Sequence, residues 1–134
     1  YGGYFIDIDE YGCAVAVSEA ITDPDVPLLL GVIPTYVAVG ERVKPERSVA
    51  VGAAIGAALV RQKIPNLSEV DVTSPDDVVI RTSDGIRVLA GSADGIEERV
   101  RLLDSILASL REQDMLVDYI DVRVEAKPVI RPKR

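Results

Sequence analysis

The sequence predicts an α+β domain with a mostly antiparallel sheet and two main helices. Short segments in which apolar and polar residues alternate are joined by tight turns, which is typical of antiparallel strands. Two longer segments repeat apolar residues every three or four positions, which indicates helices that cover one face of a sheet. The 134 residues suffice for one domain, whose core consists mainly of aliphatic side chains because only 4% of the residues are aromatic.

A β-hairpin is predicted at the start of the chain. Residues 4–8 and 13–17 are short apolar segments, and Gly12 in the connection between them can supply the positive φ that a tight turn needs. Residues 28–31 are expected to dock on the core as an apolar plug. A short strand is expected to follow within residues 32–39.

The first helix is predicted from Pro45, at the first helical position, to about Lys63, because Pro65 ends it. Its middle, residues 49–60, consists of small apolar residues that permit close packing on a sheet. As a helix this stretch is about 18 Å long, whereas the hydrocarbon core of a bilayer measures about 30 Å. It is therefore too short to span a membrane.

Three segments after the first helix predict a meander: residues 69–73, 78–81 and 86–90. The last two are joined by Asp84–Gly85, a dipeptide that strongly favours a hairpin turn. A second helix comes next in the chain.

This second helix is predicted over residues 94–113, with Ser92 or Asp94 as its cap. Its apolar residues form one stripe at steps of three and four. They are Ile96, Val100, Leu103, Leu107 and Leu110.

The last long strand is predicted at Val117–Glu125, where side chains alternate between two faces. The face predicted to be buried carries Ile120, Val122 and Val124. The other face carries Tyr119, Asp121, Arg123 and Glu125. We expect the domain to span residues 1–128, and residues 129–134 to be a C-terminal tail.

Composition argues against several functional classes. The net charge of −7 is unfavourable for nucleic-acid binding, which depends largely on Lys and Arg contacts to phosphates. The chain has no His, the usual general base near neutral pH and the commonest metal ligand. Its single Cys13 lies in an apolar run and is interpreted as a small core residue. We therefore predict no catalytic residue, no cofactor and no metal site.

Two weaker chemical interpretations concern a set of carboxylates and a glycine-rich turn. Asp7 and Asp9 could join Asp121 in a carboxylate-dependent hydrolase, although the polar face of a hairpin explains the first two more simply. The Gly91–Gly95 turn before the second helix resembles an anion-binding turn. It lacks the spacing and the Lys of a phosphate loop, which favours helix capping.

A series of short motifs runs along the chain. They are the Asp9–Gly12 turn, the Pro27–Gly31 segment, the Asp84–Gly85 turn, the strand end at Leu89–Gly91, the Leu-rich helix from Ile96 and the strand Tyr119–Arg123. Together they resemble the extracytoplasmic β domain of the bacterial divisome protein FtsQ, called DivIB in Gram-positive bacteria. The resemblance covers nearly the whole chain.

The resemblance implies a non-enzymatic, single-pass membrane protein that holds the septal complex together at the division site. In that family the β domain binds FtsB/DivIC-type and FtsL-type division proteins on the outer side of the cytoplasmic membrane. The strand after the last helix lies at the sheet edge and pairs with a segment of the partner. The family's membrane span and preceding small domain would lie before Tyr1, so we expect the chain to be a fragment.

We therefore expect residues 119–127 to form a binding edge, because an exposed edge carries unpaired N–H and C=O groups that can pair with a further strand. The expected partner-binding residues are Tyr119, Asp121, Arg123, Val124, Glu125 and Lys127. Besides the hydrolase interpretation above, two alternatives stay open. These side chains could merely face solvent or pair with one another, or the chain could be an unrelated α+β binding module that shares only the strand and helix pattern.

Overall fold

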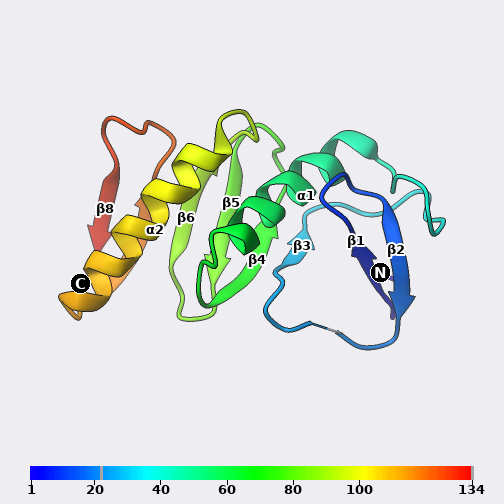
Figure 1. Ribbon diagram of the computed structural model, residues 1–134, viewed down its shortest axis with the longest axis horizontal. Coiled ribbons are helices and arrows are strands. Elements are labelled where there is room, and N and C mark those ends of the chain that lie inside the picture. The colour runs from blue at the N-terminus through cyan, green and yellow to red at the C-terminus, as the bar shows by residue number, and fades with distance from the viewer. Residues whose placement is uncertain (22, 134) are drawn as a thin grey trace.

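Two helices and eight strands are distributed along residues 1–21 and 23–133, the part of the chain that the computed structural model describes (Figure 1). The elements are β1 (Phe5–Ile8), β2 (Ala14–Ser18), β3 (Leu28–Leu30), α1 (Glu46–Arg61), β4 (Leu67–Asp71), β5 (Val78–Thr82), β6 (Arg87–Gly91), α2 (Ile96–Glu112), β7 (Val117–Asp121) and β8 (Val129–Pro132). β1 and β2 form the predicted hairpin, and the other strands form one six-stranded sheet. The α+β prediction is confirmed.

The large sheet has the strand order β3-β4-β5-β6-β7-β8. β4, β5 and β6 form the predicted antiparallel meander, and β7 and β8 are also antiparallel. β3 runs parallel to β4, and β6 runs parallel to β7. Parallel neighbours need a long crossover, and here α1 and α2 supply the two crossovers. The sequence pattern predicted the helices but not these parallel pairs.

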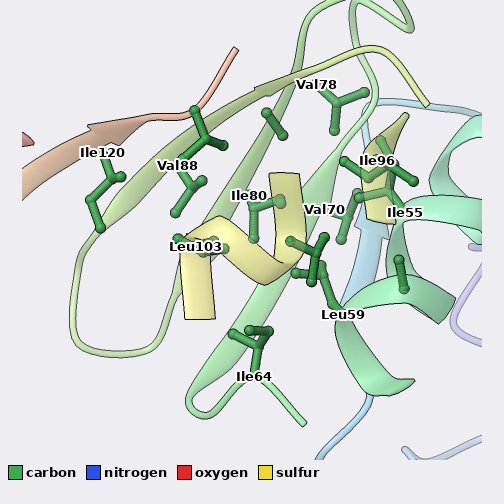
Figure 2. Packing of buried hydrophobic residues seen from close by; sticks show 14 of the residues in the cluster. Ile55, Leu59, Ile64, Val70, Val78, Ile80, Val88, Ile96, Leu103 and Ile120 are labelled. Carbon is green, nitrogen blue, oxygen red and sulfur yellow. The ribbon is translucent and has the colours of Figure 1, made fainter. Parts of the chain in front are cut away.

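Both helices lie on one face of the sheet and bury a common aliphatic core (Figures 1 and 2). The alternation in β5 places Val78 and Ile80 toward the helices, where each is at most 1% exposed. Leu103 of α2 is buried to the same extent. Burying a side chain of this size stabilises the fold by about 1.5–3 kcal/mol, so the Leu stripe of α2 is the main apolar contribution of that helix.

The hairpin packs on the start of α1 through a second, smaller cluster. Its buried members are Ala14, Val43 and Val49, and Leu29 and Val32 contact both clusters. Cys13, predicted to be a core residue, is only partly buried and forms an isolated bridge with Arg42. The β1–β2 hairpin is thus attached to the sheet through side chains.

The starts of both helices differ in detail from the prediction. Pro45 is the N-cap of α1, with an extended backbone, and Glu46 is the first helical residue. α2 begins after Gly95, whose φ is 68°, and no side chain caps it. The expected caps Ser92 and Asp94 contribute their carbonyl oxygens instead, as acceptors for the Arg99 guanidinium. No helix in residues 1–21 and 23–133 is long and apolar enough to cross a membrane.

The predicted strand Val117–Glu125 is shorter than expected, because β7 ends at Asp121. There the Asp121 carboxylate accepts the backbone N–H of Arg123 (3.0 Å), an Asx-type bond that turns the chain. A second turn comes next, in which Lys127 N–H donates to the Val124 carbonyl (3.0 Å). Val124, predicted to be buried, is 61% exposed.

Two further expectations are wrong. The segment predicted as a free tail forms β8 at residues 129–132, which pairs with β7. The strand predicted within residues 32–39 is reduced to an isolated bridge between Tyr36 and Lys44. Pro34 lacks the N–H that a continuous ladder needs.

Candidate functional site

The six predicted binding residues lie on β7 and in the connection to β8, at one end of the sheet (Figure 1). Tyr119 and Asp121 are on β7, on the face that the helices leave uncovered, since Ile120 between them is fully buried in the core. The other four belong to the β7–β8 connection. They are Arg123, Val124, Glu125 and Lys127. Chain folding therefore does bring the predicted residues together, in a hairpin instead of along one strand.

Asp121 and Arg123 form the best-defined ion pair in this hairpin. The Arg123 Nε donates to Asp121 Oδ1 (3.0 Å) and Nη2 donates to Oδ2 (2.8 Å). Arg123 also lies 3.5 Å from the Asp77 carboxylate. Hydrogen bonding from the Arg123 side chain lowers the pKa of Asp121, and the same contact raises the pKa of Arg123. Both side chains are thus engaged within the domain, where they fix the path of the chain after β7.

Tyr119 stands between two cations on the open face of the sheet. The Arg87 guanidinium lies 5.8 Å from the centroid of the Tyr119 ring, within the range of a cation–π contact. Arg131 is the cross-strand partner of Tyr119 on β8. Arg87 and Arg131 were not among the predicted site residues. Finding them requires the parallel β6–β7 register and the existence of β8, neither of which a local pattern reveals.

β8 is the edge strand at this end of the sheet, and the segment 119–127 is not the edge that was predicted. β7 is hydrogen-bonded on both sides, to β6 and to β8, whereas β8 has a neighbour on one side only among the described residues. All four residues of β8 are exposed, including Val129 (48%) and Ile130 (38%). The prediction failed because it treated the strand that follows the last helix as the last strand of the sheet.

The orientation of the β8 backbone can be derived from one hydrogen bond. Lys133 N–H donates to the Leu116 carbonyl (3.0 Å), so residue 133 points toward β7. Because backbone groups alternate along an antiparallel strand, Arg131 and Val129 also point inward, and Ile130 and Pro132 point outward. Pro132 has no N–H, so Ile130 supplies the outward N–H donor of this four-residue strand.

The carboxylates of the hydrolase alternative do not converge. Asp7 is on β1 in the two-stranded sheet, and Asp9 lies in the hairpin turn, where it accepts the N–H groups of Tyr11 (2.9 Å) and Cys13 (3.0 Å). Asp121 is on β7, near the opposite end of the molecule (Figure 1). Within the described ranges no three His, Cys, Asp or Glu side chains could hold a metal ion. The hydrolase interpretation is wrong because its three residues cannot share a substrate.

A comparison with protein families shows which family the chain belongs to. The model of the C-terminal domain of the cell division protein FtsQ/DivIB matches residues 2–123. The chain belongs to the FtsQ/DivIB family. The match covers the elements from β1 to β7 and stops before β8. No curated protein matches the chain. Membership in the FtsQ/DivIB family assigns the domain a role in cell division.

Proposed function

We propose that this FtsQ/DivIB domain is a non-enzymatic scaffold of the bacterial divisome. It binds FtsB/DivIC-type and FtsL-type division proteins by strand addition at β8. The full-length protein carries the domain on the outer side of the cytoplasmic membrane, anchored by a single span at the division septum. The observation that carries the proposal is the free edge of β8, where Ile130 directs its N–H and C=O away from β7.

Backbone pairing alone offers little affinity at so short an edge. β8 has four residues, and Pro132 removes one of the outward donors. Each backbone hydrogen bond contributes only about 0.5–1.5 kcal/mol net. Side chains must therefore add to binding, and those at the edge are basic: Lys127, Arg131 and Lys133. An added strand with Asp or Glu at facing positions would fit them best.

The predicted site residues take different roles in this proposal. Tyr119 contacts the partner from the open face beside Arg131, while Val124, Glu125 and Lys127 contact it from the β7–β8 turn. Asp121 and Arg123 act on the partner mainly by holding that turn in place, since their charges already satisfy one another. Loss of the Asp121–Arg123 ion pair would destabilise the position of β8, and would affect partner binding mainly in that indirect way.

The decisive experiment is a titration of the domain with the extracytoplasmic segment of an FtsB/DivIC-type protein. Ile130→Pro removes the outward donor and leaves the inward bonds of Arg131 and Val129 intact. We expect it to weaken binding about tenfold, the equivalent of about 1.4 kcal/mol. Ile130→Ala is the matched control, because it shortens the same side chain but keeps the N–H, and should bind within about threefold of the wild type.

Unchanged binding by a folded Ile130→Pro variant would exclude strand addition at β8. Equal losses for the Pro and Ala variants would assign the energy to the Ile130 side chain instead of the backbone. Repeating the titration with an FtsL-type segment, alone and with the first partner present, separates independent binding from joint binding.

A further inference from the structure

An apolar groove is lined by residues of β1, β3 and α1 and of the segments next to them. β1 and β3 lie toward the end of the molecule opposite to β8 (Figure 1). Its volume is about 670 Å³. Several large apolar side chains that line it are exposed, namely Ile21 (49%), Val26 (47%), Leu28 (38%), Leu30 (38%) and Val60 (44%). Contiguous exposed apolar surface of this kind marks an interaction site on a soluble domain.

The floor of the groove is one face of α1 made almost entirely of small residues. The α1 residues that line it recur at steps of three and four: Val49, Gly52, Ala53, Gly56, Ala57 and Val60. Val49, Gly52 and Ala53 in the first half of this stripe are already buried by other parts of the domain, among them Leu29 at Gly52. The accessible part of the groove floor is therefore Gly56, Ala57 and Val60. Small side chains along such a stripe let another backbone approach closely.

The two glycines of this stripe differ in their surroundings. A Cβ at Gly52 would overlap Leu29 and come within 3.1 Å of Val72, so the fold itself requires glycine there. A Cβ at Gly56 would meet nothing within 4 Å. Glycine in a helix interior lowers helix stability relative to alanine. Packing within the domain therefore does not account for Gly56, which keeps the groove floor open.

The charged residues that line the groove all carry one sign. They are Asp7, Asp9, Glu10 and Asp23, with no Lys or Arg among the lining residues that the structure describes. Glu10 is neutralised in part by Arg61 of α1 (3.0 Å). Residues 1–41 as a whole contain seven acidic residues and no Lys or Arg. A ligand of complementary charge therefore carries cations beside its apolar surface.

The shape of the groove favours a helix over a strand as its occupant. β3 is only three residues long and lies between Pro27 and Gly31, so an added strand could make few backbone hydrogen bonds with it. The accessible end of the α1 stripe, in contrast, has open space at Gly56, which lets the backbone of a second helix approach closely.

We propose that this groove docks an amphipathic helix from a partner protein, with one apolar face and Lys or Arg along its flanks. The apolar face covers the accessible end of the α1 stripe, from Gly56 to Val60, together with Leu28 and Leu30. The cations lie against the acidic residues that line the groove. This contact is independent of β8, so an Ile130→Pro variant that loses the strand-adding partner retains it.

The test uses two synthetic 15-residue helical peptides with the same Leu face, one flanked by Lys and the other by Glu. Each carries a fluorophore and is titrated with the 134-residue chain by fluorescence anisotropy. We expect saturable binding of the Lys-flanked peptide that weakens as salt is added, and at least about tenfold weaker binding of the Glu-flanked peptide. Absence of saturable binding, or equal binding of the two peptides, overturns the proposal.

Two variants assign the site. Gly56→Leu fills the floor of the groove and should weaken binding of the Lys-flanked peptide at least about tenfold. Unchanged binding by this variant, with cooperative unfolding retained, overturns the proposal. Asp23→Asn keeps the hydrogen bond from Asp25 N–H (3.0 Å) but removes one rim charge, and should weaken binding about twofold to fivefold.

Asp114→Asn is the matched charge control for Asp23→Asn. Asp114 follows α2, outside the groove, and its φ of 51° is one that Asn tolerates. This variant should bind the Lys-flanked peptide like the wild type. An equal loss of binding in both Asn variants would assign the effect to net charge and overturn the proposal.

Sedimentation of the chain alone tests whether a second copy of the chain occupies the groove. Self-association that Gly56→Leu abolishes would replace the partner helix with a homodimer.

Discussion

Two parallel crossovers, β3–α1–β4 and β6–α2–β7, flank the central strand β5 and share the same local backbone arrangement. In each, the first strand leads into a glycine with positive φ, Gly31 (86°) in one and Gly91 (78°) in the other. A backbone hydrogen bond then joins the two strands just beyond their paired region. Val72 N–H donates to the Leu30 carbonyl (2.9 Å), and Val122 N–H donates to the Leu89 carbonyl (3.1 Å).

The second strand of each crossover also ends in the same way. Asp71 accepts the N–H of Thr73 (2.9 Å), and Asp121 accepts the N–H of Arg123 (3.0 Å). The two crossovers differ in the next segment of the chain. After Asp71 the chain continues into the next strand of the meander, whereas after Asp121 it turns back as β8, an edge strand. The same way of ending a strand is thus followed by an interior strand in one crossover and by an edge strand in the other.

The largest expected effect is the difference in stability between Ala variants of Gly31 and Gly91. A Cβ at Gly31 would lie 2.5 Å from the backbone N of Thr73, whereas a Cβ at Gly91 would lie 3.5 Å from its nearest neighbour, the Arg123 Cγ. Gly31→Ala should lower the free energy of unfolding by about 3 kcal/mol or more, through overlap added to backbone strain. Gly91→Ala should cost only about 1–2 kcal/mol, from the strain of a positive φ. Urea unfolding of both variants measures the difference, and equal losses would show that the crossovers are packed alike.

A smaller effect separates the two glycines of α1. Gly52→Ala places a methyl group against Leu29 and Val72, and should lower the free energy of unfolding by about 1–2 kcal/mol. Gly56→Ala adds a methyl group where there is space, and should raise it by about 0.5–1 kcal/mol through helix propensity. Thermal unfolding of both variants beside the wild type shows whether the signs are opposite. A destabilised Gly56→Ala would mean that the groove floor is already packed.

The sequence was sufficient to predict elements whose signals are local. The hairpin around Gly12, the meander around Asp84–Gly85 and the Leu stripe of α2 are specified by turn residues and by side-chain periodicity. The family motifs add the division role, which no pattern in composition carries. These predictions succeeded because each depends on residues close together in the chain.

Features that depend on distant contacts were missed. β8 is four exposed residues that become a strand only because β7 pairs with them, and a Pro-containing end looks locally like a tail. The period-two pattern of Val117–Glu125 continues past Asp121, although the Asp121 side chain competes for the backbone and turns it. Arg87 lies beside Tyr119 on the open face only because β6 and β7 pair in parallel, in a register that no local pattern predicts. The prediction therefore assigned the edge of the sheet to the wrong strand.

The smallest expected effect is on the pH dependence of the free energy of unfolding. It concerns Asp71 and Asp121, whose carboxylates accept hydrogen bonds from different donors. Hydrogen bonding from the Thr73 side chain is the largest cause that lowers the pKa of Asp71, and the Arg123 side chain is the largest for Asp121. Because each folded-state pKa lies below the unfolded value of about 3.9, each contribution is complete above about pH 4 and is lost as the pH falls through the folded-state pKa. Asp71→Asn and Asp121→Asn, which keep an oxygen for the backbone N–H, should each cost roughly 1 kcal/mol at pH 7 and almost nothing at the lowest pH.

Salt concentration should also affect the stabilising contributions of Asp71 and Asp121 to different extents. The Asp121 pair depends on the charge of Arg123, so its contribution should shrink between low salt and about 1 M salt, where the screening length falls to about 3 Å. The contribution of Asp71 should shrink less, because the Thr73 hydroxyl donates to it without a charge (2.7 Å). Urea unfolding of the wild type and both Asn variants at two salt concentrations measures this contrast. Equal salt dependence would show that Arg81, 3.0 Å from Asp71, holds that carboxylate more than Thr73 does, and that the two strand ends are electrostatically equivalent.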